Sequence, residues 1–210
     1  VERYCQGEND LKKQYQAERL FIYLGRIAPE KNVEALLKGW KFSDMGPHCK
    51  LLMVGDGILK STLQTHYGPE MGVHWLGFVA DELTRIQLLR AADAFILPSL
   101  VEGLSLSLLE AMACGTACVA TDAGADGEVL ENGAGIVLKT QGVTAQLKIL
   151  LPLLRDHPEI TELLGRKARE RVLERYTFAA NMAQLESLYQ TLVPHQAHST
   201  NLSSYFYLLE

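Results

Sequence analysis

Six short apolar runs, each about the length of a β-strand, alternate with segments of helical periodicity and restrict this chain to one class of fold. The runs are nearly continuous rather than alternating, which indicates strands that are buried on both faces. Crossover helices produce this burial when they connect parallel strands. We therefore predict an α/β fold with a doubly wound, Rossmann-like parallel sheet. The predicted strands are residues 20–24, 50–54, 73–76, 94–97, 117–120 and 135–138.

The helical segments indicate how the chain is organised. Between the strands, helices are predicted at 33–40, 58–66, 82–91 and 105–114, with a weaker one near Glu128. Beyond residue 138 the pattern is helical only, and predicted C-terminal helices at 142–155, 159–174 and 178–192 are interrupted at Pro152, Pro158 and Thr177. We expect residues 1–19 to be a linker from a missing N-terminal domain, 20–193 to form one domain, and 194–210 to be an unassigned tail.

Charge and cysteine usage exclude several classes of function. A net charge of -5 argues against a nucleic-acid-binding surface, which needs clustered Lys and Arg side chains. The four cysteines lack the paired spacing of a zinc site, so we predict reduced and mostly buried thiols and no metal. No apolar stretch is long enough to cross a bilayer and no signal peptide opens the chain, so we expect a cytoplasmic location.

Ligands of doubly wound sheets bind beyond the carboxyl ends of the strands, so the loops that follow each strand are the candidate site. The first loop, residues 25–32, begins with Gly25 and leads into a helix N-terminus, which attracts anions. Arg26 and Lys31 add two cations there. The sequence predicts a phosphate site in this loop, with two solvated surface charges as the alternative.

Two further loops are ambiguous when each is taken alone. Residues 54–57 read Val-Gly-Asp-Gly, and the glycines permit either a close approach to a ligand or an ordinary turn that Asp56 caps. Residues 76–79 read Leu-Gly-Phe-Val, where Phe78 either packs on a base or closes the core. The loop at 120–128 is rich in glycine and either offers amides to a ligand or forms a flexible turn.

Two glutamates eight residues apart carry the strongest signal. Glu110 is the single charge in an otherwise apolar predicted helix, where an ionised carboxylate is costly unless it is paired. A ligand with vicinal hydroxyls would supply the missing donors. Glu102 lies in the preceding loop, near the amides of that helix. The alternative is a surface Glu102 favoured by the helix dipole and a buried structural Glu110. The spacing disfavours a hydrolase-type acid and base pair, so we assign binding roles to both.

In order, these motifs resemble the C-terminal domain of family 4 glycosyltransferases, one half of the two-domain GT-B fold. The matching residues are Gly-Arg and Glu-Lys within 25–31, Gly-Asp-Gly at 55–57, Leu-Gly-Phe-Val at 76–79, the Pro-Ser to Ala-Cys-Gly segment at 98–115, and the loop ending at Glu128. Five motifs in the expected order, each after a predicted strand, are more specific than any one of them. The segment from Glu174 to the last predicted helix resembles the closing helices of the family.

This resemblance implies a role for each matching residue. Arg26 and Lys31 would hold the diphosphate of a nucleotide sugar, Glu102 the hydroxyls of the donor sugar, and Glu110 those of the ribose. The reaction would retain the anomeric configuration, and cations and amides rather than a metal would stabilise the leaving diphosphate. The other donor-binding positions that the resemblance implies are Gly25, Phe78, Val79, Gly103, Leu104 and Ser105, with Phe78 and Val79 beside the base.

Three positions depart from the family pattern without removing a charged contact. Asn32 stands where glycine is usual, Thr116-Ala117 replaces a residue followed by proline, and Ala125 replaces a second glycine. We expect a UDP-, GDP- or ADP-linked sugar as donor substrate and no other cofactor. The acceptor site, and any contact with a membrane, would belong to the missing N-terminal domain. Without it we expect no transferase activity from this chain.

Two other classes of function share features of this sequence. A non-catalytic α/β module with a vestigial nucleotide-sugar site would share all of these motifs, and donor binding separates it from a functional domain. A dinucleotide-dependent oxidoreductase shares the fold class, but the first strand is not followed by a GxGxxG turn. The donor's base and sugar, the acceptor and the pathway do not follow from these residues.

Overall fold

The computed structural model describes residues 10–192 and divides the chain into two compact units between Thr177 and Phe178. The first unit holds the sheet, and the second contains helix α9 (Phe178–Leu192), in which no residue is buried. Among the described residues, every helix is too short or too polar to cross a membrane. The predicted tail at 194–210 and residues 1–9 of the predicted linker lie outside the described residues.

Six parallel strands form one sheet in the part of the chain that the structure describes, in the order β3-β2-β1-β4-β5-β6. This order reverses direction between β1 and β4 and confirms the predicted doubly wound, Rossmann-like fold. Phe21 in β1 lies opposite Leu51 in β2 and Ala94 in β4. The strands are β1 (Arg19–Leu24), β2 (Cys49–Val54), β3 (Val73–Gly77), β4 (Ala94–Leu97), β5 (Ala117–Thr121) and β6 (Ile136–Leu138).

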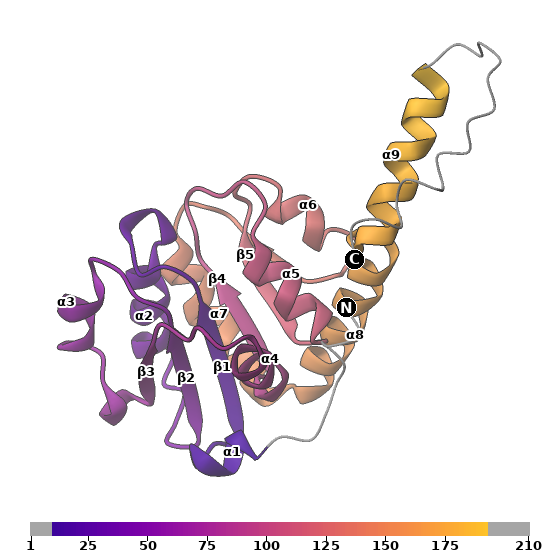
Figure 1. Cartoon of the computed structure of the whole chain (residues 1–210). Helices are drawn as coiled ribbons and strands as arrows, with labels where there is room; N and C mark the ends of the chain where they lie inside the picture. The colour runs from indigo at the N-terminus through magenta and orange to yellow at the C-terminus, as the bar shows by residue number, and fades with distance from the viewer. Residues whose placement is uncertain (1–9, 193–210) are drawn as a thin grey trace. The chain divides into compact units, whose positions relative to one another are not determined.

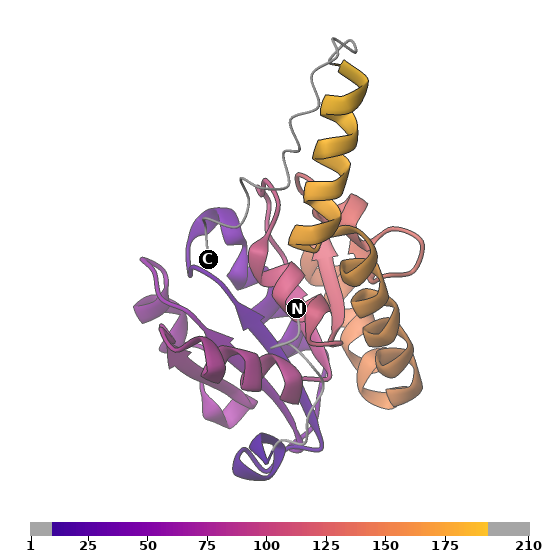
Figure 2. The same cartoon turned by 45° about the vertical axis from the view of Figure 1, so that its right-hand side comes forward.

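Helices cover both faces of this sheet (Figures 1 and 2). On one face α2 (Val33–Phe42) packs against α7 (Val143–Asp156). On the other, α4 (Glu82–Ala91) packs against α5 (Leu106–Ala113), and α8 (Pro158–Arg175) packs against α5 and β5. The short elements are α1 (Leu11–Gln14), α3 (Lys60–Gln64), α6 (Asp126–Leu130) and the 3-10 turns η2 (Pro29–Lys31) and η3 (Pro69–Met71).

The core consists of the apolar runs that predicted the strands. Phe21, Tyr23 and Phe95 are fully buried between the two helical layers. Trp40 on α2 contacts Phe21 edge-on, with ring centroids 5.4 Å apart, and its Nε1 donates a hydrogen bond to the Met71 carbonyl at 2.8 Å. Burial of such side chains contributes about 1.5–3 kcal/mol each, so the central strands are a rigid platform for the loops that follow them.

The predicted interruption at Pro152 is wrong, because α7 continues through this residue. Proline cannot donate to the carbonyl four residues earlier, that of Lys148, and costs a helix about 3 kcal/mol. The Ser43 hydroxyl approaches this carbonyl at 3.4 Å, although its shorter bond, 2.6 Å, goes to Gly39. Burial of Leu147, Leu151 and Leu154 on the same helix outweighs the loss. The breaks at 158 and 177 do coincide with helix boundaries.

Candidate functional site

The reversal of strand order places the carboxyl ends of β1 and β4 next to each other, with their following helices on opposite faces of the sheet. Such a switch point opens the crevice in which this class of fold binds ligands. The loop after β1 (residues 25–32) meets the loop after β4 (residues 98–105), and the Leu100 amide donates to the Glu30 carbonyl at 2.8 Å. Two loops that the sequence predicted to bind a ligand are therefore brought together.

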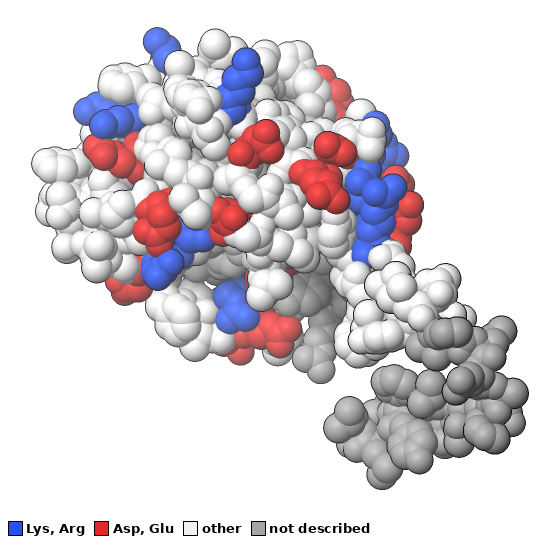
Figure 3. Space-filling model, turned by 90° about the horizontal axis from the view of Figure 1, so that it is seen from above, with Lys and Arg blue, Asp and Glu red and all other residues white. Residues whose placement is uncertain are grey.

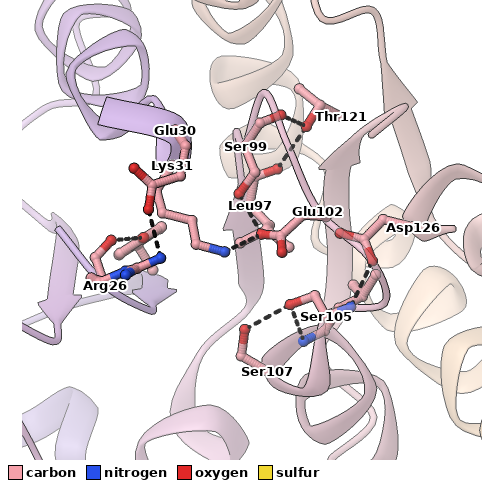
Figure 4. A network of polar contacts seen from close by, with 12 residues as sticks. Arg26, Glu30, Lys31, Leu97, Ser99, Glu102, Ser105, Ser107, Thr121 and Asp126 are labelled. Carbon is pink, nitrogen blue, oxygen red and sulfur yellow. Dashed lines mark hydrogen bonds and ion pairs between the residues drawn. The ribbon is translucent and has the colours of Figure 1, made fainter. Parts of the chain in front are cut away.

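Lys31 and Glu102 form an ion pair across this switch point (Figure 4). The Lys31 Nζ lies 2.6 Å from Glu102 Oε1, and only 18% and 8% of the two side chains are exposed. The Ser99 hydroxyl donates to the same carboxylate oxygen at 2.7 Å. Neither charge is the solvated surface group of the alternative interpretations. Each was predicted to face a ligand, and here they are partners of each other.

Arg26 is arranged differently. Its guanidinium is 67% exposed and pairs with Glu30, four residues later, with 2.6 Å between Nη2 and Oε1. Its backbone is held, because the Tyr23 hydroxyl donates to the Arg26 carbonyl at 2.7 Å. The side chain can therefore turn toward an incoming anion while the main chain stays in place.

A cavity of about 430 Å³ opens at the carboxyl ends of β1, β2 and β3. Four predicted site residues line it, namely Gly25, Arg26, Phe78 and Val79. Phe78 is 75% exposed, so the interpretation that it closes the core is wrong. A cavity of this size, with an aromatic side chain at its edge and few polar groups, suits a small organic ligand. Its other lining residues are Leu24, Val54, Gly55, Asp56 and Arg85.

The Gly-Asp-Gly loop supports the first loop. Gly55 has a φ of 136°, and a Cβ there would collide with the carbonyl oxygen of Gly25, so the glycine permits the close approach of two loop backbones. Asp56 does not cap the next helix as the turn interpretation predicted. It accepts from the Gly57 amide at 2.7 Å and pairs with Lys60, which is already the first residue of α3.

Glu110 lies half-buried on α5. Burial raises the pKa of its carboxyl group; Arg85, which also lines the cavity, lowers it, and Glu82 raises it further. Within residues 10–192 its carboxylate has no hydrogen-bond or ion-pair partner. The structural alternative required such a partner, whereas a ligand hydroxyl would supply one.

Three predicted donor-binding residues, Gly103, Leu104 and Ser105, lie in the loop before α5, and the amide of one of them is already hydrogen-bonded. Ser105 is the N-cap of α5, and its amide donates to Asp126 Oδ1 at 3.0 Å. In the described part of the chain, the amides of Gly103 and Leu104 have no hydrogen-bond partner, and a Cβ at Gly103 would meet open space. These two amides therefore remain available to an anion at the helix N-terminus.

One protein-family model matches the segment that contains all of these loops and strands. The model of group 1 glycosyl transferases matches residues 8–171. The chain belongs to this family. It is 31% identical over 188 residues to the N-acetyl-alpha-D-glucosaminyl L-malate synthase of Bacillus anthracis, covering 85% of this chain and 48% of that protein. It is 33% identical over 179 residues to the phosphatidyl-myo-inositol mannosyltransferase of Mycolicibacterium smegmatis, covering 83% and 45%.

Solved structures confirm that this is the fold of a GT-B C-terminal domain. The C-terminal domain of the group 1 family protein LpcC from Francisella tularensis superposes with a TM-score of 0.75 at 21% identity, covering 84% of this chain and 97% of that one. The Anabaena protein HepE in complex with UDP-glucose has a TM-score of 0.73 at 25% identity, covering 90% and 55%. The group 1 domain described here thus spans about half the length of its curated relatives.

The departures from the family pattern have a structural basis. Asn32 has a φ of 50°, in the left-handed region that glycine favours and asparagine tolerates better than most residues. Ala125 has a φ of -89°, which any residue adopts. The Thr116 hydroxyl donates to the Leu89 carbonyl at 2.7 Å and so anchors the start of β5. None of these substitutions strains the loops of the group 1 domain.

The remaining predictions concern thiols, metals and surface charge. Cys49, Cys114 and Cys118 are free and buried as predicted, and Cys5 lies outside the described residues. No three or more His, Cys, Asp or Glu side chains between residues 10 and 192 are grouped to hold a metal ion. Acidic and basic side chains are interspersed on the face seen in Figure 3.

Sequence reasoning missed Asp126, which lies at the start of α6 and is 1% exposed. Burial raises the pKa of its carboxyl group to about 6, and the nearby Glu102 adds to the rise, whereas the Ser105 amide and Lys31 oppose it. The glycine-rich loop had marked the region, but an acid that hydrogen-bonds 21 residues back along the chain leaves no local pattern.

Proposed function

We propose that this group 1 domain binds the donor substrate of a retaining glycosyltransferase, which moves a sugar from a nucleoside diphosphate sugar to an acceptor in glycan or glycolipid biosynthesis. The observation that carries the proposal is the Lys31–Glu102 pair at the switch point, beside a cavity of about 430 Å³. The HepE structure, which contains UDP-glucose, has the same fold and supports this choice of ligand.

In the proposed complex the base lies by Phe78 and Val79 in the cavity, and the ribose hydroxyls bind the unpartnered carboxylate of Glu110. The diphosphate lies between Arg26 and Lys31, and the donor sugar lies at Glu102. Arg26 is exposed and can turn to the phosphates, whereas Lys31 must share its ammonium between Glu102 and the ligand.

Charge stabilisation is the proposed catalytic contribution of this domain. Negative charge develops on the diphosphate as the bond to the sugar breaks. In this proposal Arg26, Lys31 and the amides of Gly103 and Leu104 stabilise that charge without a metal or another cofactor. Pre-organised groups of this kind need little rearrangement during the reaction, which makes them effective.

The acceptor is expected to bind to a second domain. The chain spans about half of the two curated relatives named above, so we propose that the remaining part of such a protein supplies the acceptor site, any membrane contact and the groups that face the reacting carbon. On this proposal the domain alone binds donor but does not transfer sugar. The three free, buried cysteines are typical of a reducing compartment and support a cytoplasmic location.

A thermal-shift panel of UDP-, GDP- and ADP-linked sugars tests the donor site. A ligand that binds only the folded state stabilises it by about 2.7 kcal/mol at one hundred times its Kd. We expect a shift for one base, and loss of that shift in Lys31→Met. Lys38→Met is the matched control, because Lys38 forms an exposed pair with Glu34 on α2. A flat panel on a cooperatively melting protein, repeated by calorimetry, would overturn the proposal in favour of a vestigial site.

A further inference from the structure

The loop that carries Glu102 is held at both of its ends by residues at or just beyond the end of β5. At one end, the hydroxyl of Thr121, the last residue of β5, donates to the Ser99 carbonyl. At the other, Asp126 accepts from the Ser105 amide at 3.0 Å (Figure 4). Between them, the Ala125 amide donates to the Gly103 carbonyl at 2.8 Å. The position of Glu102 is therefore set by the neighbouring strand as well as by its own.

The two loops also touch directly. Gly124 has a φ of 58°, and a Cβ there would collide with the carbonyl oxygens of Glu102 and Gly103. Only glycine permits this approach, so the backbone after β5 lies against the backbone that carries the acid. At Gly124 the two loops are therefore in direct backbone contact.

Asp126 is the unusual member of this contact. An ionised carboxylate that is 1% exposed is costly unless it is well paired, and its identified partner is one amide. The charged groups that act on it are Glu102 and Lys31, from the two loops at the switch point. On its own helix Glu128 is exposed, and the first turn of α5 contributes no acid. Lys31, Glu102 and Asp126 thus form a cluster of one cation and two acids.

We propose that Asp126 is a positioning residue of the donor site, which holds the Ser105 end of the Glu102 loop while its negative charge opposes an incoming diphosphate. This inference rests on the proposed function. Holding and charge are separable, because a protonated or amidated side chain keeps a carbonyl oxygen that accepts from the Ser105 amide. Loss of the acceptor should loosen the loop, and loss of the charge alone should favour an anionic ligand.

The charge of Asp126 changes within an accessible pH range, because burial and Glu102 raise the pKa of this carboxyl group to about 6. At pH 8 it opposes a diphosphate, and at pH 5 it does not. Asp126→Asn has no such charge at either pH. The affinity of Asp126→Asn divided by that of the natural chain, compared between the two pH values, therefore isolates Asp126 from every other titrating residue of the site.

Calorimetry with UDP-glucose at pH 5 and pH 8 tests both roles. UDP-glucose has no terminal phosphate monoester, whose ionisation near pH 6 would interfere. We expect Asp126→Asn to bind about threefold more tightly than the natural chain at pH 8, as weak Coulomb repulsion predicts, and equally at pH 5. Asp126→Ala should bind UDP-glucose about tenfold more weakly than Asp126→Asn at both pH values, because the hydrogen bond from the Ser105 amide is lost. Equal affinities of Ala and Asn variants, or a pH-independent ratio, would overturn the proposal.

Hydrogen exchange of the free chain decides the positioning role without any ligand. In Asp126→Ala the Ser105 amide should exchange at least about tenfold faster than in the natural chain, since a hydrogen bond of ordinary strength is lost. In Asp126→Asn its exchange rate should be unchanged. Asp122→Ala is the matched control, an exposed acid of the same loop. Unaltered exchange in Asp126→Ala would overturn the inference. If no nucleotide sugar shifts the melting temperature but the Ser105 amide exchanges faster in Asp126→Ala, the donor function is overturned and Asp126 keeps only its role in holding the loop.

Discussion

Two ion pairs of the same length, 2.6 Å, lie at the switch point and differ in how far their side chains are buried. Arg26 is exposed and Glu30, four residues later, is partly exposed, and the two pair within a single loop. Lys31 and Glu102 come from different halves of the sheet and are largely buried. The shared length conceals a difference in burial, and burial determines how each pair responds to the loss of a partner.

An exposed pair is worth about 0–1 kcal/mol, because water and salt screen it, and either member is free to leave for a ligand. A buried pair is costly to break by removal of one partner, because an uncompensated charge remains. In this domain Arg26 is thus the adjustable cation and Lys31 the fixed one. Both are proposed to contact one diphosphate.

The largest expected effect follows from breaking the buried pair. Lys31→Met leaves Glu102 with the Ser99 hydroxyl as its remaining identified partner and should lower the free energy of unfolding by about 3–5 kcal/mol. Urea denaturation at pH 7.5 measures this loss. The double variant Lys31→Met with Glu102→Gln should regain most of it, because the stranded charge is removed. A Lys31→Met chain as stable as the natural one would mean that the pair is not buried in solution.

The next largest effect on stability is expected from Asp126, the acid beside that pair. A carboxyl group whose pKa is raised from near 3.8 to about 6 by folding makes the protein lose stability as the pH rises between these values. The loss reaches up to about 3 kcal/mol by pH 7. Asp126→Asn should escape it, so the difference in unfolding free energy between variant and natural chain should grow from pH 4 to pH 7. A constant difference would show that Asp126 titrates normally.

Glu110 tests whether an unpaired acid behaves differently from a paired one. Glu110→Gln should weaken binding of the selected nucleotide sugar by about 1–3 kcal/mol, the worth of hydrogen bonds to a charged group. Its stability should not fall, since burial already raises the pKa of this carboxyl group and disfavours its charge. Calorimetry and thermal melting measure the two quantities. Glu34→Gln, an exposed acid on α2, is the control; equal donor affinity in both variants would remove Glu110 from the site.

The smallest effect on stability is expected from the exposed pair. Arg26→Met should change the free energy of unfolding by less than about 1 kcal/mol. If Arg26 is the adjustable cation, donor affinity should nevertheless fall, and the fall should shrink as salt is raised from 0.05 to about 0.5 M, where screening is stronger. A stability loss as large as that of Lys31→Met would erase the contrast between the two pairs.

The sheet could be predicted closely from the sequence, because each strand is a nearly continuous apolar run bounded by turn residues. All six predicted strands agree with the structure to within one residue at each end. The error at Pro152 has the opposite origin. A local rule placed a break there, and contacts of α7 with distant residues, including Ser43, overrode it. The short turns η2 and η3 lack a periodic pattern long enough to detect.

The candidate site was predictable as a set of loops but not as a set of contacts. Arg26, Lys31 and Glu102 were selected by residue type and position after a strand, which local sequence carries. That Lys31 and Glu102 pair with each other depends on strand order, which no single loop encodes. The same holds for Asp126 and Ser105, whose hydrogen bond joins the ends of two adjacent strands.

Lys31 and Glu102 are 71 residues apart in the chain, and that separation has a consequence for the order in which the domain folds. The first three strands can pair as soon as they exist, yet the crevice has no second wall until β4 inserts beside β1. Contacts over so long a span form late, after the entropy of closing the loop has been overcome. During synthesis, a chain that has emerged only through β3 would have Lys31 without its partner. If the proposed function holds, competence for the donor therefore appears only after β4, the loop at 98–105 and helix α5 have been added.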